Sequence, residues 1–140
     1  MNIVLGSDHA GFKMKKEIMN YLKRRKIKFK DFGTFSEASV DYPDIAYPVA
    51  KAVARKKFDK GILICGSGIG MSMVANKVKG IRAALCHNEI TATMAREHND
   101  ANVLCLGARV LSKRKAVNIV RIFLKARFAR GRHLRRVKKI

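Results

Sequence analysis

Residues 61–77 combine a short apolar run, a glycine-rich turn and a run of helix-forming residues. The apolar run at 62–65 is partly β-branched and flanked by glycine, which is typical of a strand covered on both faces in a parallel sheet. Three glycines follow at alternate positions: Gly66, Gly68 and Gly70. A helix starting near Met71 would direct its unpaired N–H groups and positive dipole end at this turn. The stretch therefore predicts an anion-binding turn, with Cys65 and Ser67 at its mouth.

Each part of this stretch also has a simpler interpretation. Glycines after a strand often serve only the turn, and a lone cysteine at a strand end is commonly an inert apolar residue. Two nucleotide-binding patterns do not fit. No Lys-Ser or Lys-Thr follows the last glycine, as a P-loop requires, and Gly70 comes one position too early for the dinucleotide pattern. An anion site is favoured, but a nucleotide is not.

The rest of the chain alternates strand-like and helix-like segments five times. Predicted strands cover residues 2–6, 27–32, 59–65, 80–86 and 103–106. Predicted helices run from Gly11 to about Arg25 and over residues 45–57, 71–78, 91–98 and 113–128, followed by a basic tail from about residue 129. In the first helix, Met14, Ile18, Tyr21 and Leu22 are expected on the inner face and the lysines on the outer face. The alternation predicts an α/β fold with a five-stranded parallel sheet, helices on both faces and right-handed crossovers.

The length and apolar content fit a single domain over residues 1–140. Of the 140 residues, 48% are hydrophobic, which suffices for one core. No apolar run approaches the roughly 20 residues of a membrane span, and the N-terminal segment lacks the regions of a signal peptide. We therefore expect a cytoplasmic protein with no membrane partner.

Three widely spaced cysteines end apolar runs, and we expect them to line one edge of the sheet. They are Cys65, Cys86 and Cys105. Their odd number and the lack of a C-x-x-C pair argue against a disulfide framework and a structural zinc site.

The charge is strongly and unevenly basic. Lys and Arg total 31 against 10 acids, which gives +21, and after Asp100 there are thirteen Lys or Arg and no acid. Such a field attracts phosphates, anionic metabolites and nucleic acid alike. For most of these side chains a solvated basic surface is the simpler interpretation.

Most candidate functional residues follow predicted strands. Asp8 and His9 follow the first, the Cys65 turn follows the third and Arg109 follows the fifth. Ligands of open α/β sheets bind at this edge, although Asp8 also suits a helix N-cap and His9 a plain surface position. His98 and Asn99 come at the end of a helix and are expected at the opposite edge. They could meet Cys65 only across a subunit interface or through an unusual bend of the chain, and this geometry indicates a dimer.

A thiol, an anion-binding turn and several arginines suit two kinds of chemistry. A thiolate beside a helix N-terminus can act as a base, backbone N–H groups can stabilise an oxyanion, and arginines can hold a phosphate. These parts fit proton abstraction beside a carbonyl through an enediolate. They fit covalent thiol chemistry such as acyl transfer equally well.

The ordered motifs resemble the type B ribose-5-phosphate isomerases, which belong to one superfamily with the galactose-6-phosphate isomerase subunits. The similarity extends over essentially the whole chain. The matching segments are residues 6–12 (GSDHAGF), 41–44 (DYPD), 65–72 (CGSGIGMS), 75–77 (ANK), 80–84 (GIRAA), 95–102 (AREHNDAN), 107–109 (GAR), 131–133 (GRH) and Arg136.

The resemblance implies a fold, an assembly and an activity. It implies a Rossmann-like three-layer α/β/α sandwich and a homodimer, or dimer of dimers, whose active sites are shared between subunits. It also implies interconversion of D-ribose 5-phosphate and D-ribulose 5-phosphate, a step of the pentose phosphate pathway, with no metal and no cofactor.

The resemblance further implies a role for each candidate residue. Cys65 is similar to the base that moves the proton between C1 and C2. The other catalytic candidates are Ser67 beside the transferred proton, His98 for ring opening and Asp8 at the sugar hydroxyls. The candidates for binding are the backbone of Gly66, Gly68, Ile69 and Gly70 for the enediolate oxygen, Asn99 for the sugar, and His9, Arg109, Arg132 and Arg136 for the phosphate.

Three features depart from the family pattern or vary within it. Ser67 replaces the usual threonine, and Met71 occupies the place where members without the cysteine have a glutamate. The charge of +21 is higher than is typical. Two alternatives therefore stay open: a phosphorylated hexose such as allose or galactose 6-phosphate as substrate, and a polyanion- or nucleic-acid-binding protein on the same fold.

Overall fold

The protein is built on one parallel β-sheet. The structure, a computed structural model, describes residues 1–140. Its strands are β1 (Asn2–Ser7), β2 (Lys28–Asp31), β3 (Lys60–Cys65), β4 (Ala83–Leu85) and β5 (Val103–Gly107). They lie in the order β2-β1-β3-β5-β4, and every neighbouring pair is parallel. The predicted α/β class and five-stranded parallel sheet are confirmed.

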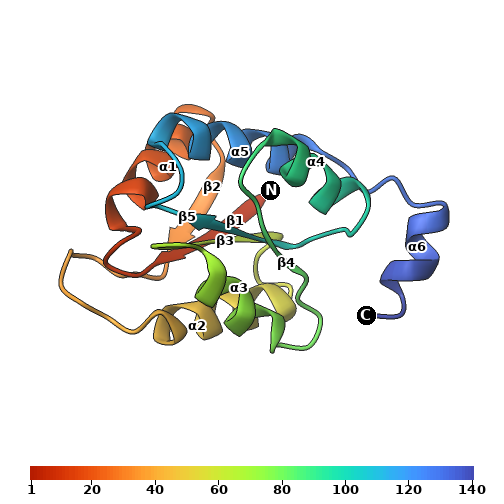
Figure 1. The fold of residues 1–140 in the computed structure, drawn as a ribbon, viewed down its shortest axis with the longest axis horizontal. Coiled ribbons are helices and arrows are strands. Elements are labelled where there is room, and N and C mark those ends of the chain that lie inside the picture. Colours follow the sequence, from red (N-terminus) through yellow and green to blue (C-terminus); the bar gives the residue numbers. More distant parts are fainter.

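Helices cover both faces of this sheet, which gives three layers (Figure 1). They are α1 (Phe12–Arg24), α2 (Tyr42–Ala54), α3 (Ile69–Asn76), α4 (Glu89–Glu97), α5 (Lys113–Lys125) and α6 (Arg132–Val137). Helices α1, α4 and α5 pack on one face, and α2 and α3 pack on the other. None of the helices has the length and apolarity needed to cross a bilayer.

Each sheet face has its own apolar core, because successive strand residues point to opposite faces. In β1, Ile3 and Leu5 join the cluster under α1, α4 and α5, whereas Val4 joins the cluster under α2 and α3. All three are completely buried. A central strand covered on both sides has to be apolar throughout, and this explains the continuous apolar runs in the sequence.

Three helices begin earlier than predicted, and one of them is α3, which begins at Ile69, directly after Gly68 at its N-cap. The other two have signals in their first turns. Helix α2 begins at Tyr42, after Asp41 in an extended conformation and with a proline in the first turn. Helix α4 begins at Glu89, because the Asn88 side chain accepts from the Thr91 N–H in a capping box. At its other end, α5 stops at Lys125 rather than at 128, since Ala126 has an extended backbone.

The fourth strand is shorter than predicted, with three residues instead of seven. Two side chains accept from backbone N–H groups at the start of β4, those of Ala83 and of the residue before it. The Arg82 N–H donates to Asn102 Oδ1 at 2.9 Å, and the Ala83 N–H donates to Asn76 Oδ1 at 2.8 Å. The Arg82 carbonyl still accepts from the Asn102 N–H at 3.1 Å, but because the Arg82 N–H is bound to a side chain, the regular ladder begins only at Ala83.

The expectation that the lysines of α1 face solvent is wrong for Lys15, which is completely buried. Its Nζ donates to Asp31 Oδ1 at 2.6 Å and to the Thr34 carbonyl at 2.5 Å. Burial lowers the pKa of Lys15, and the hydrogen bond and charge of Asp31 oppose that shift. The ion pair therefore ties α1 to the end of β2, and the bond to Thr34 ties it to the segment that follows.

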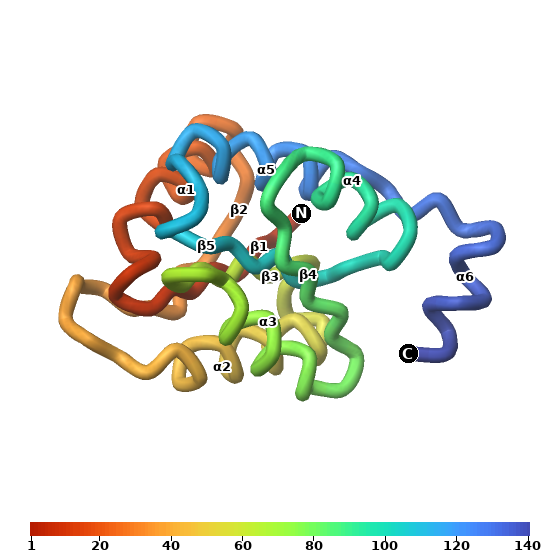
Figure 2. The backbone as a smooth tube through the Cα atoms, in the orientation of Figure 1, coloured from red at the N-terminus to blue at the C-terminus, as the bar shows by residue number.

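The basic tail contains a short helix, α6, that the sequence analysis did not predict. No residue of α6 is buried. The helix lies beside the body of the protein rather than within a layer (Figure 2). Before it, the Ala129 N–H donates to the Glu97 carbonyl at 3.0 Å, which holds the tail at the end of α4.

Candidate active site

The carboxyl ends of β1 and β3 lie side by side at the point where the chain changes direction across the sheet. From β1 the chain continues to β2 on one side, and all later strands lie on the other side. Asp8 directly follows β1 and Gly66 directly follows β3. Ligands of open α/β sheets bind at such switch points, because the diverging connections leave a crevice there.

A cavity of about 320 Å³ opens at this point, and it contains six of the predicted site residues. Those six are Asp8, Cys65, Gly66, Ser67, Gly70 and Arg109. Tyr42 and Val110 complete the lining and were not predicted as site residues. Tyr42 belongs to the DYPD motif that carried the resemblance, so a signal for it was present in the sequence. Only the fold shows that its ring lies against Gly70, where an added Cβ would come within 2.7 Å of the ring.

The turn after β3 holds the Cys65 thiol at the start of α3. Cys65 Sγ accepts a hydrogen bond from the Gly68 N–H at 3.1 Å. Gly68 has a φ of 80°, and a Cβ there would come within 2.5 Å of the Leu85 side chain and 2.9 Å of the Leu106 backbone. Only glycine fits at position 68. The turn directs the N–H group of Gly68 at the sulfur of Cys65.

Some of the backbone donors expected for an oxyanion are already engaged. The Gly68 N–H donates to the thiol, and the Ile69 N–H donates to Ser67 Oγ at 3.2 Å. The Ser67 hydroxyl is consequently fixed beside the turn.

Asp8 serves the start of α1 and also lines the cavity. Its Oδ1 accepts from the Gly11 N–H at 3.0 Å, and its own N–H donates to the Ile64 carbonyl at 3.1 Å. The first bond orders the turn before α1, whose N-cap is Gly11 rather than Asp8, and the second bond joins this turn to β3. Asp8 can therefore stabilise the turn before α1 and also face the cavity.

His9 and Arg109 follow different strands, β1 and β5. His9 Nδ1 accepts from the Val40 N–H at 3.3 Å, which ties His9 to the loop before α2, and His9 does not line the cavity. The Arg109 N–H donates to the Gly66 carbonyl at 2.9 Å, and its side chain passes over Gly66. The exposed Arg109 guanidinium forms no ion pair and is available to an anion.

His98 and Asn99 lie at the opposite edge of the sheet, as the sequence predicted. They follow α4, and a few residues later the Asn102 carbonyl accepts from the Gly61 N–H at the beginning of β3. Arg82 and the buried Arg96 both bind the Asp100 carboxylate, at 2.9 and 2.8 Å. These two ion pairs fix the turn that contains Asn99.

The tail contributes to the same edge. The rings of His98 and His133 stack, with centroids 4.3 Å apart and 5° between their planes. Loss of solvation lowers the pKa of His133, with further lowering by His98, Arg132 and Arg136. The structure therefore groups His98 with the tail helix that contains both predicted phosphate-binding arginines.

The candidate residues thus form two groups at opposite edges of one chain. Within a single copy, the structure does not bring His98, Asn99, Arg132 or Arg136 to the cavity that contains Cys65. Nor does any group of three or more His, Cys, Asp or Glu side chains suit a metal ion.

The other two cysteines are buried, and only part of the expectation for them holds. Cys86 follows β4, but Cys105 pairs with Leu63 inside the sheet rather than at its edge. Burial raises the pKa of the Cys86 thiol to about 11, against a weaker opposing effect of a hydrogen bond with Thr91. Burial also raises the pKa of Cys105, with smaller effects from Cys65 and Cys86.

Known proteins with a similar sequence and fold confirm the resemblance. The family model described as Ribose/Galactose Isomerase matches residues 3–140. Ribose-5-phosphate isomerase B of Escherichia coli K12 is 46% identical, over 99% of this chain and 93% of its own.

Two solved structures have the same fold. That of Clostridium thermocellum ribose-5-phosphate isomerase B is 53% identical with a TM-score of 0.98, over 99% of this chain and 94% of its own. That of Mycoplasma genitalium ribose-5-phosphate isomerase B with bound ribulose-5-phosphate is 48% identical with a TM-score of 0.95, over 99% of this chain and 92% of its own.

Proposed function

Because this chain belongs to the ribose/galactose isomerase family, we propose that it interconverts D-ribose 5-phosphate and D-ribulose 5-phosphate. The observation that supports this most directly is the Cys65 thiol, which lines a cavity with Asp8 and Arg109 and accepts the Gly68 N–H. Relatives that share the fold over nearly their whole length are named for this reaction.

The proposed mechanism moves one proton between neighbouring carbons. The Cys65 thiolate takes the proton from C2 of the open-chain aldose, and the electron pair of that bond moves toward the C1 carbonyl, giving an enediolate. The thiol then returns the proton to C1, and the hydroxyl proton of O2 passes to O1, so C2 becomes the carbonyl. The reaction is redox-neutral and consumes no co-reactant. The Ser67 hydroxyl and those backbone N–H groups of residues 66–70 that the Cys65 and Ser67 side chains leave free stabilise the charge on oxygen.

The remaining roles divide between two copies of the chain in this proposal. Asp8 contacts the sugar hydroxyls, and His9 and Arg109 approach the phosphate from the same copy as Cys65. His98 opens the furanose ring, Asn99 binds the sugar, and Arg132 and Arg136 bind the phosphate from a second copy. The separation of the two groups in one chain supports a homodimer, alone or paired into a dimer of dimers. Residues 1–140 act as one domain.

The proposed activity is tested by incubating the purified chain with D-ribose 5-phosphate, with and without a chelator, and measuring ketose formation. Ketose formation that is unchanged by the chelator is expected. Allose 6-phosphate and galactose 6-phosphate are measured in parallel. Activity on a hexose phosphate alone would move the assignment to a hexose phosphate isomerase, and activity lost on chelation would contradict the metal-free mechanism.

Mixing two inactive variants tests the shared site. In a heterodimer of Cys65→Ala and His98→Ala, one site combines both lesions and the other has both wild-type groups. Random mixing makes about half of the dimers mixed, so we expect about a quarter of wild-type activity. Refolding the two variants together, with a different tag on each, allows the mixed dimers to be isolated and assayed. Inactive mixed dimers would show that each site is built from a single copy.

A further inference from the structure

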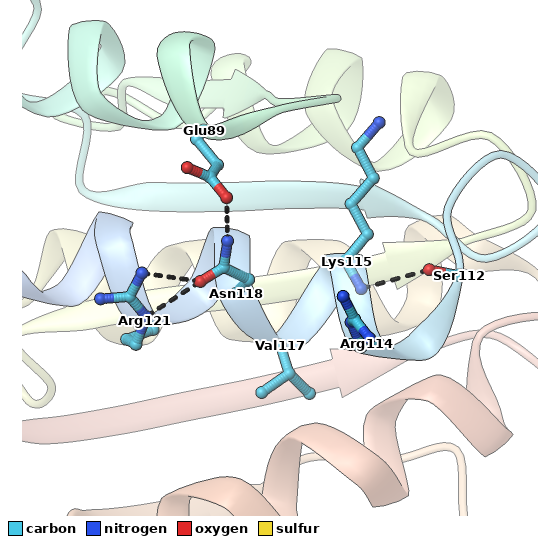
Figure 3. A pocket seen from close by; sticks show the side chains of 7 residues that line it. All are labelled: Glu89, Ser112, Arg114, Lys115, Val117, Asn118 and Arg121. Atoms are coloured by element: carbon cyan, nitrogen blue, oxygen red, sulfur yellow. Dashed lines mark hydrogen bonds between the residues drawn. The ribbon is translucent and has the colours of Figure 1, made fainter.

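The outer surface of α5 contains two adjoining hollows that share Arg121. The first, of about 890 Å³, is shown in Figure 3 and is lined by Glu89, Ser112, Arg114, Lys115, Val117, Asn118 and Arg121. The second, of about 390 Å³, is lined by Met1, Tyr21, Arg25, Ile27, Arg121, Leu124 and Lys125. We call the five exposed cations of these linings the basic track: Arg25, Arg114, Lys115, Arg121 and Lys125.

The charges of the basic track are not compensated by acids. None of its five side chains forms an ion pair. Glu89 is the one acid in either lining, and its carboxylate accepts from the Asn118 amide (Figure 3). Arg121 donates from two nitrogens to Asn118 Oδ1, at 2.9 and 2.7 Å. A neutral amide thus orients this guanidinium and leaves its charge free for an anion.

The spacing of the basic track suits an extended anion rather than a single phosphate group. Arg114, Arg121 and Lys125 follow one face of α5, in line with Asn118. At 1.5 Å per residue, this row is about 16 Å long. A single sugar phosphate could contact only part of such a row.

We propose that the basic track binds the phosphate backbone of a duplex nucleic acid, independently of base sequence. Duplex DNA presents one negative charge per about 1.7 Å, which matches a row of unpaired cations. Surfaces that bind single strands use several aromatic side chains for base stacking. The two linings offer only the half-buried Tyr21, so a duplex is favoured. The net charge of +21 adds long-range attraction.

This function is separate from the proposed isomerase activity. No residue of the basic track lines the cavity that contains Cys65, and none belongs to the group around His98. Nucleic-acid binding and sugar isomerisation can therefore be changed independently. If the protein isomerises sugar phosphates but does not bind a duplex, the nucleic-acid proposal has failed. If it binds a duplex but has no isomerase activity, the isomerase proposal has failed.

The test compares two variants that lose the same number of charges. The track variant is Arg25→Gln, Arg114→Gln, Arg121→Gln and Lys125→Gln. The matched variant is Arg55→Gln, Lys57→Gln, Lys77→Gln and Lys79→Gln, whose four side chains are exposed on the α2 and α3 layer. Binding to a fluorescent 20-base-pair DNA duplex is measured by anisotropy between 50 and 200 mM salt.

For wild type we expect affinity to fall roughly a hundredfold over this salt range, as four phosphate contacts predict. The track variant should bind at least about tenfold more weakly than the matched variant, with a shallower salt dependence. Both variants should retain wild-type isomerase rates. An equal loss of DNA affinity in the two variants would overturn the proposal, because the lower net charge alone would explain it. Tighter binding of wild type to a single strand or to anionic lipid vesicles would also overturn it.

Discussion

Replacing Cys65 with alanine will lower kcat for ribose 5-phosphate by about a thousandfold or more, while the fold is retained. The proposed base is then missing, and a positioned base typically contributes 10²–10⁴-fold. Asp8 is the one carboxylate in the cavity lining, and its Oδ1 already accepts from the Gly11 N–H. Cys65→Ser should be nearly as inactive, because a serine hydroxyl fills the space but is a much weaker acid than a thiol.

The matched control for this prediction is Cys86→Ala. It removes the same atom from a buried cysteine outside the cavity and should keep kcat within a few-fold of wild type. Rates are measured by ketose formation, and near-ultraviolet circular dichroism checks the fold. A Cys65→Ala protein that keeps its side-chain spectrum and more than a tenth of wild-type kcat would remove Cys65 from the role of base.

Lys15→Ala is expected to cost about 3 kcal/mol of unfolding free energy, the largest loss of stability that we expect from a single charged residue. Removing one partner of a buried ion pair leaves the other without compensation. Here the Asp31 carboxylate, whose side chain is 16% exposed, and the Thr34 carbonyl would both lose the ammonium group. Denaturant unfolding of Lys15→Ala and of Lys16→Ala, the exposed neighbour on α1, measures the difference. Equal stability of the two variants would contradict the prediction.

The contribution of Lys15 to stability should also depend on pH. Because burial lowers the pKa of Lys15 in the folded protein, the unfolded chain binds more protons between that lowered pKa and the ordinary lysine value of 10.5. The stability contributed by Lys15 is therefore smallest below its folded pKa and rises as pH increases toward 10.5. The gap between wild type and Lys15→Ala should widen over this alkaline range. A gap that narrows there would show that the Asp31 interaction outweighs burial.

The sequence predicted the elements whose signals are local. The apolar run and alternating glycines at residues 61–70 specify a strand and a turn almost by themselves, and the structure has both. The predicted alternation of elements also led to the correct sheet. Even the placement of His98 away from Cys65 followed from its position at the end of a helix.

The features that were missed depend on contacts between distant segments. A lysine in an amphipathic helix is normally exposed, and only the packing of β2 beside β1 brings Asp31 and the Thr34 carbonyl to Lys15. Tyr42 reaches Gly70 because α2 packs against α3. The sequence shows that the α5 segment is rich in Lys and Arg. Only the folded structure shows that the α5 side chains of the basic track line two hollows and have no acidic partners.

All three cysteines are buried, but only Cys65 lines the cavity that also contains Asp8 and Arg109. The thiols of Cys86 and Cys105 have raised pKa values, so little of either is present as thiolate at neutral pH. A mild alkylating reagent should therefore react with one sulfur per chain, and bound substrate should slow the reaction. Such stoichiometric labelling would count the accessible Cys65 thiols in a preparation, and it would allow a spectroscopic reporter to be attached inside the proposed active site.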